Sequence, residues 1–332
     1  PHRSTYSKVE PTSCSLDVWA VTGLLAVSTL FFNVYMFLMS LRSARQKKPC
    51  PTDTIVMALA LAAVAHQLFC YFYLTVDQMD DTCVLSRTSY AAVLLLIFGL
   101  KFAIMWDTSF LTFYYSTKLV SAHHHCYTQL QEVILRHVTA AVLAIAACGL
   151  GGCMPMLLVF TGGNSTAARD CGAVMPESYG GQVYVAVYLV ACDILPGVFM
   201  VKCCVSIAVH LIIHLRHMKS STNGAHAPKL GSEMRVVRMA LSLVGVFAVF
   251  LAVDLYVHYL IAVKRETILV LTFVFTSVYT TVTAIVLIYG KKTLWKSLLQ
   301  DVNVCLHGCP CPSRLKVPEH GAQLDSPVRV RK

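Results

Sequence analysis

The sequence predicts an all-α membrane protein in which seven transmembrane helices form a bundle and a short amphipathic eighth helix follows them. Seven apolar stretches support this fold class, because each supplies about 20 or more mostly uncharged residues, enough to cross a hydrocarbon layer as a helix. The chain of 332 residues is 56% hydrophobic and 13% charged, whereas soluble domains carry about 25% charged residues. The basic residues also gather in alternate loops.

The seven stretches account for most of the length. They begin near Leu16, Thr54, Tyr90, Arg136, Val183, Val236 and Thr267. A backbone in lipid must satisfy its own hydrogen bonds, so each stretch is expected to be helical. We therefore divide the chain into an extracellular N-terminus at 1–15, a seven-helix bundle at 16–290, a juxtamembrane amphipathic helix at 291–303 and a cytoplasmic tail at 304–332.

The loops between the stretches differ in charge when they are taken in chain order. Basic residues follow the first stretch (Arg42, Arg45, Lys47, Lys48), surround the connection from the fifth to the sixth (Arg216, Lys219, Lys229, Arg235, Arg238) and follow the seventh (Lys291, Lys292, Lys296). The loops in between hold few: Arg87, Arg169, Lys264 and Arg265. This asymmetry predicts a multi-pass plasma-membrane protein with its N-terminus outside and its C-terminus in the cytoplasm. It also argues against nucleic acid as the partner of the +10 net charge, and membrane lipid is expected instead.

The predicted outer loops carry two candidates for extracellular modification. Cys83 precedes the third stretch and Cys171 follows the fourth, where oxidation is permitted. We expect a disulfide between them, with Cys14 as the competing outer cysteine. Asn164 begins an N-glycosylation sequon in the same loop as Cys171, and its glycosylation is expected.

The segment after the seventh stretch is predicted to lie on the membrane surface. Its leucines and a tryptophan would face lipid while its lysines face the headgroups. Three cysteines follow, namely Cys305, Cys309 and Cys311. No matching cluster of His and Cys accompanies them, so a zinc site is not expected. Juxtamembrane cysteines are often acylated, and lipidation is our interpretation, with free thiols as the alternative.

Ionisable residues inside the apolar stretches are functional candidates, because charge is costly in a membrane. They are Lys101, Asp107, Asp193, Lys202, Asp254 and His258. Asp254 and His258 are four residues apart and share a helix face, and Lys101 and Met105 are one turn apart. With Tyr279, these four are expected to line a small pocket in the outer half of the bundle. Asp107 and Asp193 are expected in an internal polar network, and for every one of these residues an interhelical hydrogen bond without a ligand is the alternative.

Catalysis finds little support in the sequence. The HExxH, GxSxG and P-loop patterns are absent, so we expect no enzyme, no catalytic residue, no metal and no cofactor. The three histidines at 123–125 are interpreted as an interfacial basic loop, because adjacent residues of a helix point in different directions. A seven-helix transporter or channel is the alternative of another class, but it would need a continuous polar path or paired broken helices.

The sixth stretch carries a family resemblance. It opens with Glu233-Met234-Arg235 and runs on to Val253-Asp254, which resembles vomeronasal type 1 receptors and the olfactory receptor class A-like proteins of fish. Residues 277–283 are similar to the Tyr-containing seventh segment of that family, although Ala284 stands where the family usually has proline. The outer loop with its sequon and Cys171 also matches the family's layout.

The bitter taste receptor family is the alternative. Residues 114–119 resemble that family's third-helix end, and residues 288–292 resemble its last helix. The Ser-Arg pair typical of its second helix is absent around 62–64, so we prefer the vomeronasal-like interpretation.

Either resemblance implies a G-protein-coupled receptor without catalytic activity. The preferred one implies a small odorant or pheromone as ligand, bound near Lys101, Met105, Asp254, His258 and Tyr279. A heterotrimeric G protein is the implied partner on the inner face. The residues expected to face it are Lys118, Arg216, His217, Lys219, Arg235, Arg238 and Lys291, with headgroup binding as their alternative role.

Overall fold

The structure is a computed structural model that describes residues 13–46, 50–79, 86–119, 129, 132–133, 136–157, 179–221, 231–264 and 269–308. Within these ranges the chain is helical and contains no strand. Seven helical segments there are long and apolar enough to cross a membrane. They are α1 (Ser13–Gln46), α2 (Pro51–Met79), α3 (Arg87–Leu119), α5 (Val138–Cys153), the run of α7 (Tyr179–Leu189), η1 (Val190–Ile194) and α8 (Leu195–Ser221), α9 (Gly231–Lys264) and α10 (Leu269–Gly290). The predicted all-α, seven-helix fold is therefore confirmed.

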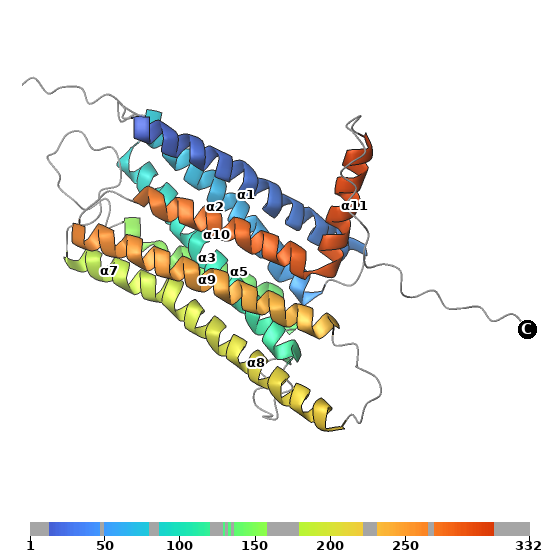
Figure 1. Ribbon diagram of the computed structural model, residues 1–332. Coiled ribbons are helices and arrows are strands. Elements are labelled where there is room, and N and C mark those ends of the chain that lie inside the picture. The colour runs from blue at the N-terminus through green and yellow to red at the C-terminus, as the bar shows by residue number, and fades with distance from the viewer. Residues whose placement is uncertain are drawn as a thin grey trace, which may run out of the picture.

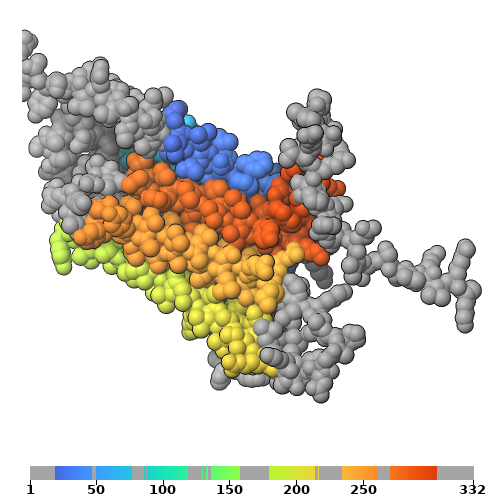
Figure 2. Space-filling view, in the orientation of Figure 1, coloured from blue at the N-terminus to red at the C-terminus, as the bar shows by residue number. Residues whose placement is uncertain are grey.

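The helices run side by side in one bundle, and α11 (Lys292–Gly308) turns across one end of it (Figure 1). Helix α1 packs on α2 and α10, α3 packs on α2, α5 and α8, and α9 lies between α8 and α10. Figure 2 shows four helices side by side across one face, in the order α1, α10, α9 and α8. Helices α3 and α10 are the most buried of the spans, so side chains on α3 have neighbours from most of the bundle.

The outer surface of the bundle is apolar, as a lipid environment requires. Leu24, Val27, Leu143 and Ile213 are all more than half exposed. The interior instead contains many polar groups, such as Thr29, whose hydroxyl lies 2.7 Å from that of Thr281 across the α1–α10 contact. These polar groups lie inside because lipid provides no hydrogen bonds, so polar side chains must find partners within the bundle.

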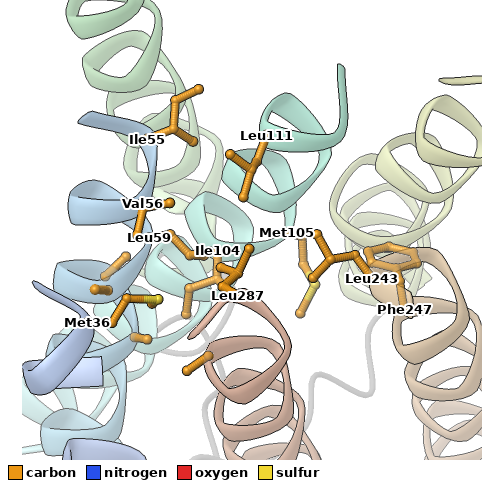
Figure 3. Close-up of a cluster of buried hydrophobic side chains, with 14 of the residues drawn as sticks. Met36, Ile55, Val56, Leu59, Ile104, Met105, Leu111, Leu243, Phe247 and Leu287 are labelled. Carbon is orange, nitrogen blue, oxygen red and sulfur yellow. The ribbon is translucent and has the colours of Figure 1, made fainter. Parts of the chain in front are cut away.

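The apolar core lies where α1, α2, α3, α9 and α10 meet. Met36, Leu59, Ile104 and Leu287 are fully buried in one cluster, and Figure 3 shows these side chains directed toward one another from four helices. The cluster fills the centre of the bundle and leaves little room for a ligand at that level.

The fifth span contains a π-helical turn just before a proline. Pro196 has no N–H to donate, which interrupts the α-helical ladder. In η1 the N–H of Leu195 bonds to the carbonyl of Val190, five residues back, as in π-helical turns. Cys192 and Asp193 in this turn are both fully buried, so the turn directs two successive side chains into the bundle.

Two side-chain contacts hold α11 against the end of the bundle. The Lys291 ammonium pairs with Asp53 Oδ1 near the start of α2, and the Tyr35 hydroxyl of α1 donates to Asp301 Oδ2 at 3.2 Å. Ser43 also donates to Asp53 Oδ2 at 3.3 Å. The short turn between α1 and α2 and the start of α11 are therefore tied together.

Candidate functional site

Three charged side chains from three spans meet inside the bundle. The Lys101 ammonium of α3 lies 2.8 Å from Asp254 Oδ2 of α9 and 3.3 Å from Asp193 Oδ2 of η1. Lys101 is 1% exposed, and both aspartates are 0% exposed. We call these three residues the charged cluster. The sequence placed all three inside spans but could not show that they touch, because their pairing depends on how the helices pack.

The π-helical turn and its bonds to α3 position Asp193 of the charged cluster. The π-helical turn directs Asp193 toward α3, and the Trp106 indole N–H of α3 donates to the Ala191 carbonyl of the same turn at 3.0 Å. Ser109 of α3 donates to the Pro196 carbonyl at 3.2 Å. These bonds fix α3 against the fifth span on either side of Asp193, at backbone carbonyls within and just after the π-helical turn.

His258 lies beside the charged cluster, one helical turn beyond Asp254 on α9. Its Nδ1 lies 2.9 Å from the Asp254 carbonyl oxygen and 3.5 Å from Asp254 Oδ2. At 7% exposure it is the least buried of these four side chains. The predicted shared face of Asp254 and His258 is therefore present in the structure.

An aromatic pair connects the charged cluster to α10. The Phe250 ring centroid of α9 lies 5.5 Å from the Lys101 ammonium and 4.7 Å from the Tyr279 ring centroid. A cation over an aromatic face is attracted by the ring's quadrupole. Phe250 was not among the predicted site residues, since one phenylalanine in an apolar stretch gives no signal in sequence.

Met105 and Asp107 lie apart from these contacts. Met105 is fully buried in the apolar core with Leu243 and Phe247 of α9 (Figure 3). Asp107 is buried, and its Oδ1 finds no hydrogen-bond partner among the described residues. Asp193, by contrast, is paired with Lys101.

Comparison with known proteins assigns the family. A family model described as taste receptor protein (TAS2R) matches residues 16–305, which include all seven spans and most of α11. The chain belongs to the taste receptor (TAS2R) family. No curated protein matches this taste receptor. The family is one of G-protein-coupled chemosensory receptors, not a class of enzymes, and membership implies a small-molecule ligand and G-protein coupling.

The assignment corrects the preferred sequence interpretation. The vomeronasal and olfactory resemblance is wrong, and the family that the sequence analysis gave as the alternative fits this chain better. The matching features of the sixth helix, a charged start and one buried aspartate, meet requirements that any span with an interior charge shares. The more informative segments were the ends of the third and seventh helices. Near the end of the third helix, the buried Tyr114 has its hydroxyl 4.0 Å from Cys50 Sγ. Just after the seventh helix, Lys291 pairs with Asp53.

The inner-face and outer-loop predictions are described only in part. Lys118, Arg216, Arg235 and Arg238 are exposed, whereas Lys291 is half-buried against Asp53. His217, Lys219 and Cys305 lie in helices, but their side chains are outside what the structure describes. The residues wholly outside the described ranges are Cys83, Cys171, Asn164, Cys309 and Cys311. In the described part of the taste receptor, no group of three His, Cys, Asp or Glu side chains could hold a metal ion.

Proposed function

We propose that this chain is a bitter taste receptor of the plasma membrane, in which a small organic molecule binds in the outer half of the bundle and promotes coupling to a G protein. The observation that carries the proposal is the charged cluster, which links α3, η1 and α9 through a single ammonium group. Buried charges in a membrane are costly and mark functional sites. Family membership supplies the chemosensory context.

The position of the cluster suits a ligand that arrives from outside. With the N-terminus outside, as the loop charges indicate, α9 runs outward from Gly231 to Lys264. Asp254 and His258 then lie in its outer half, and His258 is the more accessible of the two. We propose Lys101, Asp254 and His258 as the polar contacts of the ligand, with Met105 and Tyr279 forming the apolar floor beneath them.

Coupling follows from competition for the buried charges. A ligand that bonds Asp254 or Lys101 in one arrangement of the bundle more strongly than in another shifts the population toward that arrangement. Because Lys101 ties α9 to α3, a weaker tie frees α9 to move relative to α3. On the inner face, the exposed Lys118, Arg216, Arg235 and Arg238 would then meet the G protein, together with His217, Lys219 and Lys291.

Further features of the proposed receptor lie near the membrane surfaces. We propose a disulfide between Cys83 and Cys171 and a glycan on Asn164 on the outer side. On the inner side we propose lipidation at one or more of Cys305, Cys309 and Cys311, which would add to the attachment of amphipathic α11.

The test is a calcium-release assay in cells that express the chain with a chimeric G protein and are exposed to a panel of bitter compounds. We expect a saturable response that requires the G protein. In Asp254→Asn, the potency of charged agonists should fall about tenfold or more, the loss expected for one charge-assisted hydrogen bond, while an uncharged agonist serves as the control. A response that persists without any G protein would contradict the proposal, as would exclusive activation by pheromone-type odorants.

A further inference from the structure

We propose, on the basis of the function proposed above, that the charged cluster is a recognition site for one additional positive charge and selects small protonated amines. The sequence left open whether Lys101 attracts acids or Asp254 attracts amines. The geometry of the cluster favours the second possibility through its charge balance, its unused oxygen atoms and the bonding of its neighbouring histidine.

The charged cluster contains two carboxylates and one ammonium. Lys101 lies within 3.3 Å of an oxygen of each aspartate, so its single charge is divided between them. With His258 neutral, the formal charge of the site is negative by one unit. All three side chains are at most 1% exposed, and an uncompensated charge is costly when water is excluded. One further positive charge would balance the site.

Each aspartate has an oxygen atom available for that charge. Asp193 Oδ1 and Asp254 Oδ1 are buried and have no hydrogen-bond donor among the described residues. Lys101 already donates to both Oδ2 atoms and has the Phe250 ring 5.5 Å away. A ligand ammonium brings a charge and up to three donors, which matches two acceptor oxygens on neighbouring helices.

The other titratable side chains around the cluster are already engaged. His258 has its Nδ1 at 2.9 Å from the Asp254 carbonyl, a bond that a neutral imidazole with its proton on Nδ1 can make. His66 of α2 lies 3.6 Å from Cys70 Sγ. Cys192 and Tyr188 of the fifth span also approach the cluster, and neither can carry a positive charge. The missing charge must therefore come from outside these groups or from a bound proton.

An acidic ligand fits the site poorly. Its carboxylate would add a third negative charge around a lysine that two aspartates already neutralise, and like charges at short range repel. An amine approaching past His258, the most accessible neighbour, meets carboxylate oxygens instead.

The experiment measures the melting temperature of the purified full-length receptor in detergent with a matched series of probes. The probes are phenylalkylamines of increasing chain length, together with the alcohols and the carboxylic acids of the same skeletons. We expect a saturable rise in melting temperature with at least one amine and none with its alcohol or acid. In Asp193→Asn and Asp254→Asn, the amine concentration needed should increase about tenfold or more. Asp107→Asn is the control, since it removes a buried carboxyl group of the same helix bundle that does not contact Lys101.

Separate arms identify the source of the charge. Replacing potassium by sodium at constant ionic strength tests a bound metal cation, and lowering the pH from about 7.5 to about 6 tests a proton. Stabilisation by sodium or by acid without any amine effect would overturn the proposal. So would stabilisation by the acids, or no shift with any probe in the wild-type protein, a result that does not depend on whether the variants fold.

Calcium release with the same probes separates this inference from the proposed function. If the receptor responds through its G protein to neutral or acidic compounds alone, the bitter receptor remains and amine selection is wrong. If amines raise the melting temperature through Asp193 and Asp254 but no G protein responds, the site is correct and the proposed function is wrong.

Discussion

Single residues decide how closely the helices approach one another. A methyl group added at Gly149 of α5 would lie 2.8 Å from the Gly99 carbonyl oxygen of α3 and 2.9 Å from the Phe102 ring. The carbonyl belongs to a backbone and cannot rotate away. At Gly151, one half-turn along α5, the added methyl would meet nothing within 4 Å. The pair therefore separates helix contact from helix propensity in the same segment.

Gly149→Ala should destabilise the bundle, while Gly151→Ala should not. The first change forces α5 away from α3 at a cost of about 1–3 kcal/mol, partly offset by the helix preference for alanine. The second gains that preference alone, about 1 kcal/mol at most. Thermal unfolding in detergent and delivery to the cell surface would measure both. Equal melting temperatures and surface delivery for the two variants would show that α3 and α5 are less closely packed than the 2.8 Å approach at Gly149 indicates.

Among single helical elements, the fifth span departs most from regular geometry. Its π-helical turn leaves carbonyl groups for side chains of α3, and Trp106 donates to one of them at 3.0 Å. That bond spans two helices in a region where lipid cannot replace it. The position of Asp193, and with it the charged cluster, depends on this turn.

Trp106→Phe should loosen the turn, because it removes the indole N–H but keeps an aromatic side chain at this position. The loss of one buried hydrogen bond costs about 1 kcal/mol. The turn should then open more often, so the amides of 190–196 should exchange their hydrogens faster. Mass spectrometry of the exchanged peptides would measure it. Trp295→Phe on α11 is the control, because it removes an indole far from this span. Unchanged exchange in Trp106→Phe would mean that the turn does not need its α3 partner.

The sequence predicted these elements better than it predicted their contacts. Long apolar stretches located the spans because lipid imposes a length and a composition on each one. It could not reveal the π-helical turn, although Pro196 in a span was visible. It also began the fifth apolar stretch near Val183, whereas α7 begins at Tyr179, because a helix can continue past the hydrocarbon layer where hydropathy no longer marks it.

At the scale of the whole molecule, the two ends of the bundle are held by different means. The charged cluster lies in the half of the bundle where α9 approaches Lys264, and the opposite end is closed by Lys291 and Asp53, which join the start of α11 to α2. Lysine and aspartate in spans were recognised from sequence as candidates. Lys101 pairs with Asp193 and Asp254 but not with Asp107. This choice of partners follows from helix packing and could not be predicted from spacing along one chain.

Lys291→Gln and Asp53→Asn should each loosen α11, and the double variant should lose no more than either one. Because the pair is partly exposed, with Lys291 at 21%, the expected coupling energy is about 1 kcal/mol or less. Spin labels on α11 and α2 would report the distance between these helices. Lys292→Gln is the matched control, since the neighbouring lysine is exposed. Additive effects of the two substitutions would mean that the side chains act independently.

The proline and the π-helical turn have a mechanical consequence for the end of the bundle at which α8 ends. Helix α8 is 27 residues long and has Pro196 as its second residue, so it forms about 40 Å of rigid rod. Figure 1 shows its far end projecting beyond the neighbouring helices. Pivoting this rod by about 5° at Pro196 would displace its tip by about 3.5 Å over that length. The fifth span can thus act as a lever arm, turning an adjustment smaller than an ångström beside Asp193 into a movement of several ångströms at the end of α8.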